Sequence, residues 1–414
     1  MTSTPGATAR YPIRTATAET MEAFAAPLNL AFAEMPDPGD EERRLWEPER
    51  IIAAFDGEQP VATAGAITFR LTVPGGEAGA AGVTLVGVSP SHRRRGILRS
   101  MMRHQLDDVR ARGEPLAILW ASEGAIYQRF GYGLATLSGS FEIARDRAAF
   151  ARPAPAEGTV RLVDREAALG IFPALYDRIR VETPGMVARS EAWWRWTTLH
   201  DTDRARAENG MKFYAVYEAG GAVEGTAIYR VKPDWDERGP KGRISAIEVI
   251  TSTPPATRDL WRWLIEVDLV TLVCGVRAPV PHPLQLLLAE PRRLGFTVGD
   301  ALWLRVVDVP AALAARTYGR AGTLVLEIRD AFCPWNAGRW RLVVGEDGRG
   351  VAERTTVEPD VTLDAADLAA TYLGTFRFSE LARAGRVVEE TAGALVRADA
   401  LFTAARAPWC STMF

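Results

Sequence analysis

Hydrophobic and polar positions along the first part of the chain predict short strands followed by a helix. An apolar run at Ile51–Phe55 ends at the turn pair Asp56-Gly57, and Val61–Leu71 follows, with apolar and polar residues alternating in its second half. Such runs on either side of an Asp-Gly pair predict a β-hairpin. A second glycine-rich turn at 74–76 leads into another apolar run, Val83–Val88, which we expect to be a third strand.

The hydrophobic period then lengthens to that of an amphipathic helix over Gly96–Arg112. The apolar residues that share one face of this helix are Ile97, Leu98, Met101, Met102, Leu106 and Val109. Gly113 ends the helix, and Leu116–Trp120 has the composition of a short buried strand. A short helix near Ile126–Phe130 and a closing strand near Leu134–Ile143 complete a mixed α/β layer.

The same order of elements returns in a weaker form after a linker at Ala151–Gly158. The pattern predicts strands at Phe213–Glu218, Ala222–Val231, Ile244–Ile250 and Val270–Val276, with a helix at Asp259–Val267 before the last. We interpret this order as a diverged internal repeat. Beyond about Pro310 the pattern changes, and strands of another small α+β domain are expected at Leu324–Ile328, Trp340–Val344 and Val361–Leu363.

Length and composition indicate the class of protein. A chain of 414 residues exceeds one ordinary core, so two or three domains are expected. Hydrophobic residues make up 47% and charged residues 24%, which is typical of a soluble globular protein. The 49 Lys and Arg against 52 Asp and Glu lack the basic excess of a nucleic-acid binder. No segment has the character of a membrane span or a leader, so we expect a cytoplasmic protein with no membrane partner.

The few cysteines and histidines argue against disulfides and metal. The three cysteines lie far apart and form no CxxC pair, which is typical of a reducing compartment. The four histidines include no HExxH motif, so no metal is expected.

One segment carries candidate chemistry, because a predicted strand runs through a basic turn directly into the helix. Arg93, Arg94 and Arg95 precede Gly96, which gives an Arg-x-x-Gly motif. The first N–H groups of a helix are unpaired and carry partial positive charge, so with the arginines they suit a pyrophosphate. Gly96 would let the backbone approach the phosphates closely. Taken alone, a basic turn before a helix is also typical of a solvated surface.

In its position after the third strand, this segment resembles the cofactor segment of the GNAT superfamily of N-acetyltransferases. Val86-x-Val88 followed by Arg93-x-x-Gly96 matches it, with Leu98 in place of the usual small residue. The family's second landmark is a tyrosine at the start of a short helix, shortly before a Gly-Phe or Gly-Tyr pair. The stretch Ser122–Gly133, which contains Tyr127, matches it.

More narrowly, the chain resembles the Eis-like (enhanced intracellular survival) branch of actinobacterial acetyltransferases. The resemblance extends over nearly the whole length, on His92–Leu98, Ser122–Gly133, Trp193-Trp194, Pro359–Leu363, Tyr372–Gly374 and the terminal Phe414. It implies mixed α/β sheets, with a catalytic GNAT domain at 1–150 and a degenerate second GNAT-like domain at 151–305. A sterol-carrier-protein-like α+β domain at 306–414 and a homohexamer are also implied. Because Thr251–Pro255 lacks Arg-x-x-Gly, no cofactor is expected in the second domain.

The resemblance assigns roles in a transfer of acetyl from acetyl-CoA to a primary amine of a small molecule or a lysine. Backbone groups of Val86 and Val88 would hold the pantetheine arm. Pyrophosphate contacts would come from Arg93, Arg94, Gly96, Ile97 and Leu98. Tyr127 would protonate the leaving thiolate, and the terminal carboxylate of Phe414, made more basic by an apolar pocket, would be the base. Ser122 would touch the cofactor, or instead cap the helix that follows.

The acceptor side is expected to use acidic and aromatic residues, which suit a cationic amine. The candidates are Phe32, Asp37, Trp46 and Trp120. Relatives that acetylate polycationic amines carry an acidic residue where this chain has Met413, which disfavours aminoglycoside-type acceptors.

Simpler interpretations stay open for several of these residues. Tyr127 would serve equally as a half-buried helix aromatic and Phe414 as a plug in a core. The acidic run near Asp37 would also fit a solvated helix start. The rival class is a binding protein, either a holder of a lipid-like ligand with a vestigial acetyltransferase domain or an acetyl-CoA sensor without turnover.

Overall fold

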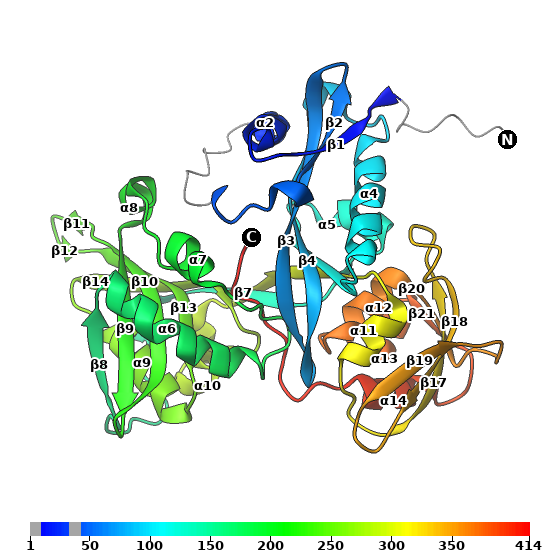
Figure 1. The fold of residues 1–414 in the computed structure, drawn as a ribbon. Helices are drawn as coiled ribbons and strands as arrows, with labels where there is room; N and C mark the ends of the chain where they lie inside the picture. Colours follow the sequence, from blue (N-terminus) through cyan, green and yellow to red (C-terminus); the bar gives the residue numbers. More distant parts are fainter. Residues whose placement is uncertain (1–9, 33–42) are drawn as a thin grey trace. The chain divides into compact units, whose positions relative to one another are not determined.

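The computed structural model describes residues 10–32 and 43–414, which divide into two compact units. The first unit takes in the chain up to Ala135, Leu302–Ala404 and Phe414. The second takes in Thr136–Ala301 and Ala405–Met413. Each unit is therefore assembled from stretches that are far apart in the sequence (Figure 1).

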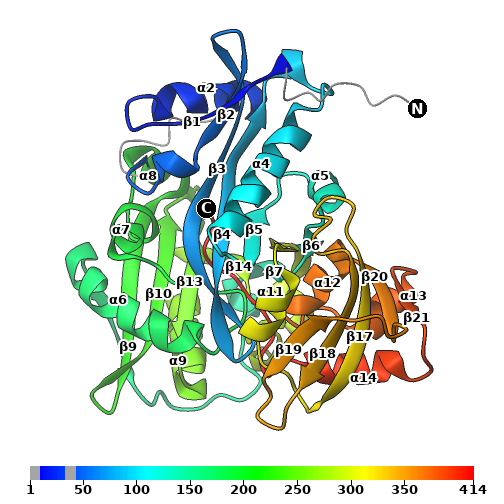
Figure 2. The same cartoon turned by 45° about the vertical axis from the view of Figure 1, so that its right-hand side comes forward.

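A seven-stranded sheet with the order β1-β2-β3-β4-β5-β16-β6 begins the first unit. Its strands are β1 (Ile13–Thr15), β2 (Ile52–Asp56), β3 (Gln59–Val73), β4 (Gly76–Val88), β5 (Leu116–Trp120), β6 (Gly133–Leu134) and β16 (Leu302–Val306). All neighbours are antiparallel except β4 and β5, which are parallel. The long β3–β4 hairpin stands upright in Figures 1 and 2, with α4 (Ile97–Ala111) beside it.

Two helices cover opposite faces of this sheet, as the alternation along β2 shows. Ile52 and Ala54 pack in the core formed with α4, whereas Ala53 and Phe55 pack in a separate cluster with Phe24 of α2 (Met21–Phe32). Successive residues of a strand point to opposite faces, so one strand contributes to both cores. The helix predicted at Gly96–Arg112 is confirmed as α4, and Met101 and Leu106 on its apolar face are fully buried.

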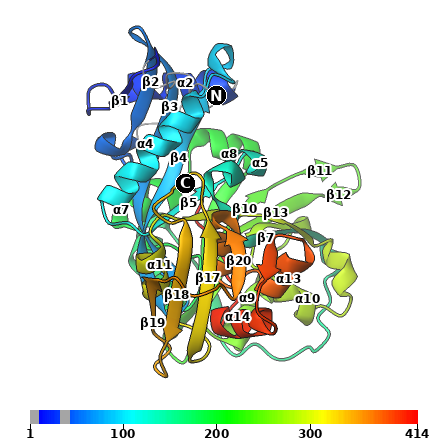
Figure 3. The same cartoon turned by 90° about the vertical axis from the view of Figure 1, so that its right-hand side faces the viewer.

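The rest of the first unit is a smaller α+β layer (Figure 3). Its sheet has the order β19-β18-β17-β20-β21. The strands are β17 (Gly322–Arg329), β18 (Gly338–Val344), β19 (Gly350–Arg354), β20 (Val361–Asp364) and β21 (Val387–Glu389). The helices of this layer are α11 (Val309–Ala315), α12 (Ala365–Tyr372), α13 (Phe378–Arg383) and α14 (Ala394–Phe402). The remaining short helix of the unit, α5 (Gly124–Tyr127), belongs to the first layer.

The second unit has its own seven-stranded sheet, with the order β15-β7-β14-β13-β10-β9-β8. The strands are β7 (Leu137–Ala144), β8 (Thr159–Val163), β9 (Met211–Ala219), β10 (Ala222–Lys232), β13 (Gly242–Thr251), β14 (Val270–Ala278) and β15 (Thr297–Asp300), and a hairpin pairs β11 (Trp235–Asp236) with β12 (Gly239–Pro240). The helices are α6 (Arg165–Arg180), α7 (Glu191–Trp193), α8 (Asp203–Asn209), α9 (Pro254–Glu266) and α10 (Leu284–Leu287). The only parallel pair in this sheet is again the one before and after a helix, β13 and β14. The predicted repeat is thus present as a second copy of the same layer.

A single strand near Leu134–Ile143 was predicted to close the first layer, and this prediction is wrong. The structure divides it into β6, which stays in the first sheet, and β7, which joins the second sheet beside β14 and β15. Phe141 and Ile143 of β7 are buried in the core of the second unit, which explains the exchange. In return, β16 inserts between β5 and β6 of the first sheet. The expected domain limits at residues 150 and 305 therefore do not coincide with the division into units.

Candidate active site

The carboxyl-terminal part of β4 leaves a strand edge without a partner. Parallel pairing with β5 runs only from Ala80 opposite Leu116 to Gly82 opposite Ile118, although β4 continues to Val88. Beyond Gly82, β4 pairs only with β3 among the described strands, and a register shift occurs near Leu85, which has a positive φ of 55°. Backbone groups on the side of β5 are thus free to bond an extended chain that carries amides. Val86 and Val88, the predicted pantetheine contacts, lie in this stretch and are partly buried.

The turn after β4 brings an uncapped helix start to the end of that edge. Gly96 occupies the N-cap of α4 with a left-handed φ of 80°, a conformation that favours glycine. No side chain of the described residues caps this helix. Ile97 is buried and Leu98 half-buried, so packing fixes the first turn while its N–H groups stay available. The predicted pyrophosphate site therefore has the local geometry that an anion needs.

The three arginines of the turn differ in what they contact. Arg93 donates to the carbonyl of Ala31 at 3.2 Å through Nη2. Arg95 donates to the hydroxyl of Tyr11 at 3.0 Å and to the carbonyl of Ser91 at 2.9 Å. Arg94 is exposed and makes no hydrogen bond or ion pair with any described residue, so it is the guanidinium most available to a phosphate.

Tyr127 combines a packed ring with an unused hydroxyl. It ends α5, is only 7% exposed, and belongs to the core that also contains Phe130 and Tyr132. Its hydroxyl bonds to no described residue. Burial, with a smaller contribution from the charge of Glu123, raises the pKa of Tyr127 to about 12, so the phenol stays protonated at physiological pH. The buried ring fits the prediction of a packed aromatic, and the protonated hydroxyl fits the prediction of a proton donor.

Ser122 does not cap α5. The N-cap position belongs to Glu123, and no side chain bonds the helix start there. Ser122 itself is exposed. The capping alternative is wrong because the helix begins one residue later than such a cap requires.

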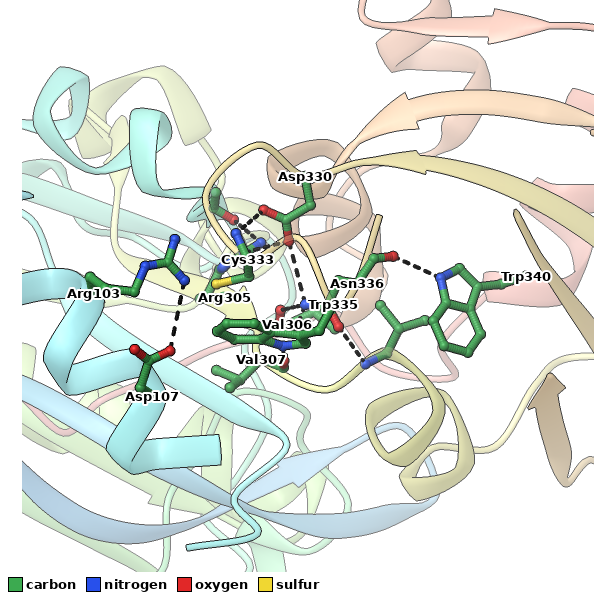
Figure 4. A network of polar contacts seen from close by, with 12 residues as sticks. Arg103, Asp107, Arg305, Val306, Val307, Asp330, Cys333, Trp335, Asn336 and Trp340 are labelled. Carbon is green, nitrogen blue, oxygen red and sulfur yellow. Dashed lines mark hydrogen bonds and ion pairs between the residues drawn. The ribbon is translucent and has the colours of Figure 1, made fainter. Parts of the chain in front are cut away.

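A buried polar network supports the turn that follows Tyr127 (Figure 4). Arg305 of β16 pairs with Asp330 at 2.5 Å, with side-chain exposures of 0% and 1%. Asp330 also accepts from the backbone N–H of Cys333 at 2.8 Å. On the other side, Nη1 of Arg305 lies 3.5 Å from the carbonyl oxygen of Gly131, and a Cβ at Gly131 would lie 2.3 Å from Nη1. No motif in the sequence marked these residues.

Phe414 lies over β4 at the point where its pairing with β5 ends. Its ring is tilted against that of Phe69, with centroids 4.9 Å apart. A Cβ added at Gly82 would lie 3.1 Å from Cε2 of Phe414 and 2.5 Å from Cε2 of Phe69. The chain end is half-buried in the first unit, so the expected burial of the terminal residue is partial.

The predicted acceptor residues are spread over several elements. Phe32 ends α2 and is 45% exposed; α2 packs closely on β4, where a Cβ at Gly87 would lie 3.1 Å from Leu28. Trp120 ends β5 and is half-buried. Trp46 packs against the cluster of Ala53 and Phe55 instead, so its ring is used in a core. Asp37 lies outside the described residues.

The second unit has a similar divergence of strands but a different helix start. Pairing of β13 with β14 ends at Ala246 opposite Gly275, although β13 continues to Thr251. The N-terminus of α9 has Pro254 and Pro255, which lack N–H groups. Thr253 already caps it by accepting from the N–H of Ala256. Few donors thus remain for a phosphate here.

The last residues before the terminus are bound inside the second unit. Trp409 donates through Nε1 to the carbonyl of Arg277 at 2.7 Å. Arg189 pairs with Glu248 at 2.6 Å and donates to the hydroxyls of Ser411 at 3.1 Å and Thr412 at 2.9 Å. These buried bonds anchor the chain two residues before Phe414. Sequence reasoning missed this anchor, whose residues form no local motif.

Comparisons with known proteins agree with this geometry. Residues 12–135 and 185–306 each match a family described as an acetyltransferase (GNAT) domain, and residues 309–411 match a sterol carrier protein domain. A protein of Streptomyces coelicolor named an uncharacterized N-acetyltransferase is 43% identical over 94% of this chain and 96% of its own. The N-acetyltransferase Eis of Mycobacterium tuberculosis is 34% identical over 89% of this chain and 90% of its own. The chain belongs to the Eis-like branch of the GNAT N-acetyltransferases.

Solved structures extend the likeness to the whole fold. The crystal structure of Eis1 from Mycobacterium abscessus superposes with a TM-score of 0.83 at 35% identity, covering 97% of this chain and 100% of that one. A GCN5-related N-acetyltransferase from Anabaena variabilis, at 22% identity, has the same fold with a TM-score of 0.84 over 98% of this chain and 100% of its own. The predicted fold class, two GNAT domains followed by a sterol-carrier-protein-like domain, is confirmed, and the protein is an N-acetyltransferase.

Within residues 10–32 and 43–414, no helix is long and apolar enough to cross a membrane. Over the same part of the chain, no cluster of three or more His, Cys, Asp and Glu side chains is arranged to hold a metal ion.

Proposed function

We propose that the protein transfers the acetyl group of acetyl-CoA to a primary amine of a small molecule or a lysine side chain, by direct attack in a ternary complex. The observation that carries this proposal is the continuity between the unpaired edge of β4 and the uncapped first turn of α4. An acyl donor with an amide-bearing arm and a pyrophosphate requires both features, in that order along the chain. Val86 and Val88 would bond the arm through their backbone groups.

The pyrophosphate would rest on the turn and the helix start. Gly96, Ile97 and Leu98 would present their backbone at the first turn of α4, and Arg94 would supply a free guanidinium. Arg93 keeps donors beyond the one it gives to Ala31, so it can hold α2 and still contact a phosphate. Ser122, exposed and unbonded by described residues, is available at the mouth of the same strand pair.

Proton movements would be handled by Tyr127 and Phe414. Acetyl-CoA supplies an activated thioester when it is bound. As the amine nitrogen bonds to the acetyl carbon, the Phe414 carboxylate takes the proton of the amine; as the C–S bond breaks, the Tyr127 hydroxyl donates its proton to the sulfur. With a phenol pKa of about 12 against about 8.5 for a thiol, complete transfer is uphill by about 5 kcal/mol. The donation therefore depends on close contact with the departing sulfur.

Acceptor contacts are proposed at the exposed and half-buried aromatic residues near the strand ends. Phe32 and Trp120 keep exposed surface that would pack against a cationic amine. Trp46 is less suited, because its ring already packs in a core.

The test is thiol release from acetyl-CoA against a panel of amines. Tyr127→Phe should lower kcat by roughly 10²–10⁴-fold, the usual contribution of a general acid. Tyr132→Phe is the matched control: this hydroxyl is fully buried without a partner, so its removal should leave turnover unchanged. A variant with one glycine added after Phe414 should also lose activity, whereas Met413→Leu, at a position 57% exposed, should retain it.

Each result distinguishes among the candidate functions. Full activity of the extended chain would remove Phe414 as the base and leave acetyl transfer intact. Binding of acetyl-CoA with no turnover on any amine would favour a sensor.

We propose a homohexameric, cytoplasmic enzyme on the strength of the Eis-like resemblance. Light scattering of the purified protein would test the assembly, because a mass other than six chains would contradict it. Fractionation of the native cells would test the location.

A further inference from the structure

The second unit contains a cavity of about 380 Å³ between the diverging ends of β13 and β14. Its walls come from residues 246–251 of β13, residues 275–283 after the pairing ends, and the tail residues Arg406, Ala407 and Trp409. The volume lies at the lower end of the 300–1,000 Å³ typical of small-ligand pockets. The cavity therefore has room for a small molecule.

Most of the cavity wall is apolar and aromatic. Phe141 and Trp261 stand against each other at one side, with ring centroids 5.7 Å apart, and Ile179 and Pro279 add aliphatic surface. His282 packs among the same rings, and burial lowers its pKa to about 4, so it contributes a neutral ring. Such a lining favours a ligand with an apolar body.

One cation in this wall has no hydrogen-bonded counter-charge among the described residues, although the charge of Glu248 acts on it from a distance. Both carboxylate oxygens of Glu248 are taken by Arg189, at 3.0 and 2.6 Å. Arg406 pairs with Glu182 at 2.5 Å. Arg277 makes no side-chain hydrogen bond or ion pair with any described residue, and its Nε is buried without a partner. Two buried or half-buried guanidinium groups thus face one carboxylate, which leaves one positive charge in surroundings that solvate it poorly.

The backbone of Arg277 has a strained conformation, which is consistent with a role in binding. Its φ is 52°, in the left-handed region that a non-glycine residue occupies at a cost of about 1–2 kcal/mol. The bond from Trp409 Nε1 to its carbonyl holds the residue in this conformation. Desolvation also lowers the pKa of the Arg277 guanidinium, which agrees with a charge that lacks a partner. Strain of this kind is typical of binding sites.

We propose that this cavity binds an apolar monocarboxylate, with its carboxylate on the Arg277 guanidinium and its aliphatic or aromatic body against Phe141 and Trp261. One free guanidinium offers two parallel N–H donors, which match a carboxylate and balance a single negative charge. Thr183, whose hydroxyl donates to the carbonyl of Ile179, adds a polar group to the same wall. The ligand is not a nucleotide cofactor, because the nearby start of α9 is capped by Thr253 and lacks two N–H groups.

Calorimetric titration of the full-length protein tests the site directly. The probes are 4-phenylbutyrate and hexanoate, each compared with its neutral amide and with inorganic phosphate. We expect one carboxylate per chain, no binding of the amides, and at least a roughly tenfold loss of affinity in Arg277→Gln, the usual effect of removing a charged hydrogen-bond partner. Arg238→Gln, an exposed position on the hairpin of the same unit, makes the same change in charge and should bind normally.

Stability without ligand provides a second, independent readout. Because Arg277 is a half-buried cation with no hydrogen-bonded partner among the described residues, Arg277→Gln should melt at the same temperature as the wild type or higher, while losing the rise in Tm that 4-phenylbutyrate gives the wild type. Undiminished binding to Arg277→Gln, equal binding of the amides, or no binding of either acid at millimolar concentration would each overturn the proposal. So would a strong loss of stability in the variant, which would make Arg277 a structural residue. A rise in Tm with phosphate but not with the two carboxylates would also overturn it, because Arg277 would then attract anions without selecting a carboxylate.

Discussion

The buried pair of Arg305 and Asp330 allows a sharp prediction about stability. Both side chains are at most 1% exposed, and the carboxylate is the only counter-charge for this guanidinium among the described residues. Asp330→Ala leaves the cation in the interior without a partner. Breaking such a pair costs about 3–5 kcal/mol. At about 2–4 °C per kcal/mol for a unit of this size, Tm should fall by about 6–20 °C.

Scanning calorimetry of four proteins would measure this effect. They are the wild type, Asp330→Ala, Arg305→Met, and the double variant. The double variant should recover most of the loss of Asp330→Ala, because a pair of apolar side chains needs no counter-charge. Asp107→Ala is the control in the same unit: it breaks the surface pair with Arg103, at 3.7 Å and half exposed, and should cost about 0.5 kcal/mol or less (Figure 4).

Two results would refute the reasoning. A drop in Tm for Asp330→Ala no larger than that for Asp107→Ala would mean that water reaches the guanidinium once the carboxylate is gone. A double variant as unstable as Asp330→Ala would mean that the loss comes from the other bonds of the carboxylate, above all the one from Cys333, and not from the stranded charge.

Three further perturbations test the site and the second unit. Gly82→Ala places a Cβ 2.5 Å from the ring of Phe69 and 3.1 Å from that of Phe414, so one ring must move and kcat should fall roughly 10–100-fold in steady-state assays; unchanged kinetics would contradict the placement of the terminus. Gly96→Ala forces an alanine to φ 80°, at about 1–2 kcal/mol, and should raise the KM for acetyl-CoA roughly 5–30-fold while leaving the KM for the amine unchanged. Burial lowers the pKa of His282 from 6.5 to about 4, so its contribution to stability is complete above pH 6.5 and is lost as the pH falls toward 4. The difference in unfolding free energy between wild type and His282→Gln should therefore shrink by about 3 kcal/mol over this range, and a difference independent of pH would sink the assignment.

Local pattern was sufficient for the elements that build the candidate site. The strand before Arg93 and the helix after Gly96 were predicted, because each is specified by its own periodicity and turn residues. The repeat was predicted for the same reason. The short helix expected near Ile126–Phe130 begins earlier, at Gly124, so Tyr127 stands at the end of α5 and not at its start. The roles of these elements in catalysis remain predictions.

The partners of β7 and the buried charge pairs could not be predicted from the sequence. Alternation in 137–144 specifies a strand but not the sheet edge that it joins, which depends on the burial of Phe141 in a core formed by later residues. Arg305 and Asp330 are 25 residues apart, and Arg189 and Glu248 are 59 apart, so nothing local connects them.

The insertion of β16 between β5 and β6 imposes an order of events on synthesis. The first sheet cannot close until Leu302–Val306 has left the ribosome, well after the 1–135 segment that supplies its other strands. During that interval the edge of β5 is an unpaired apolar strand, open to pairing with another nascent chain. Each repeat supplies a strand to the sheet of the other, β7 to the second sheet and β16 to the first. Expression or loss of one repeat alone would therefore leave the sheet of its neighbour incomplete.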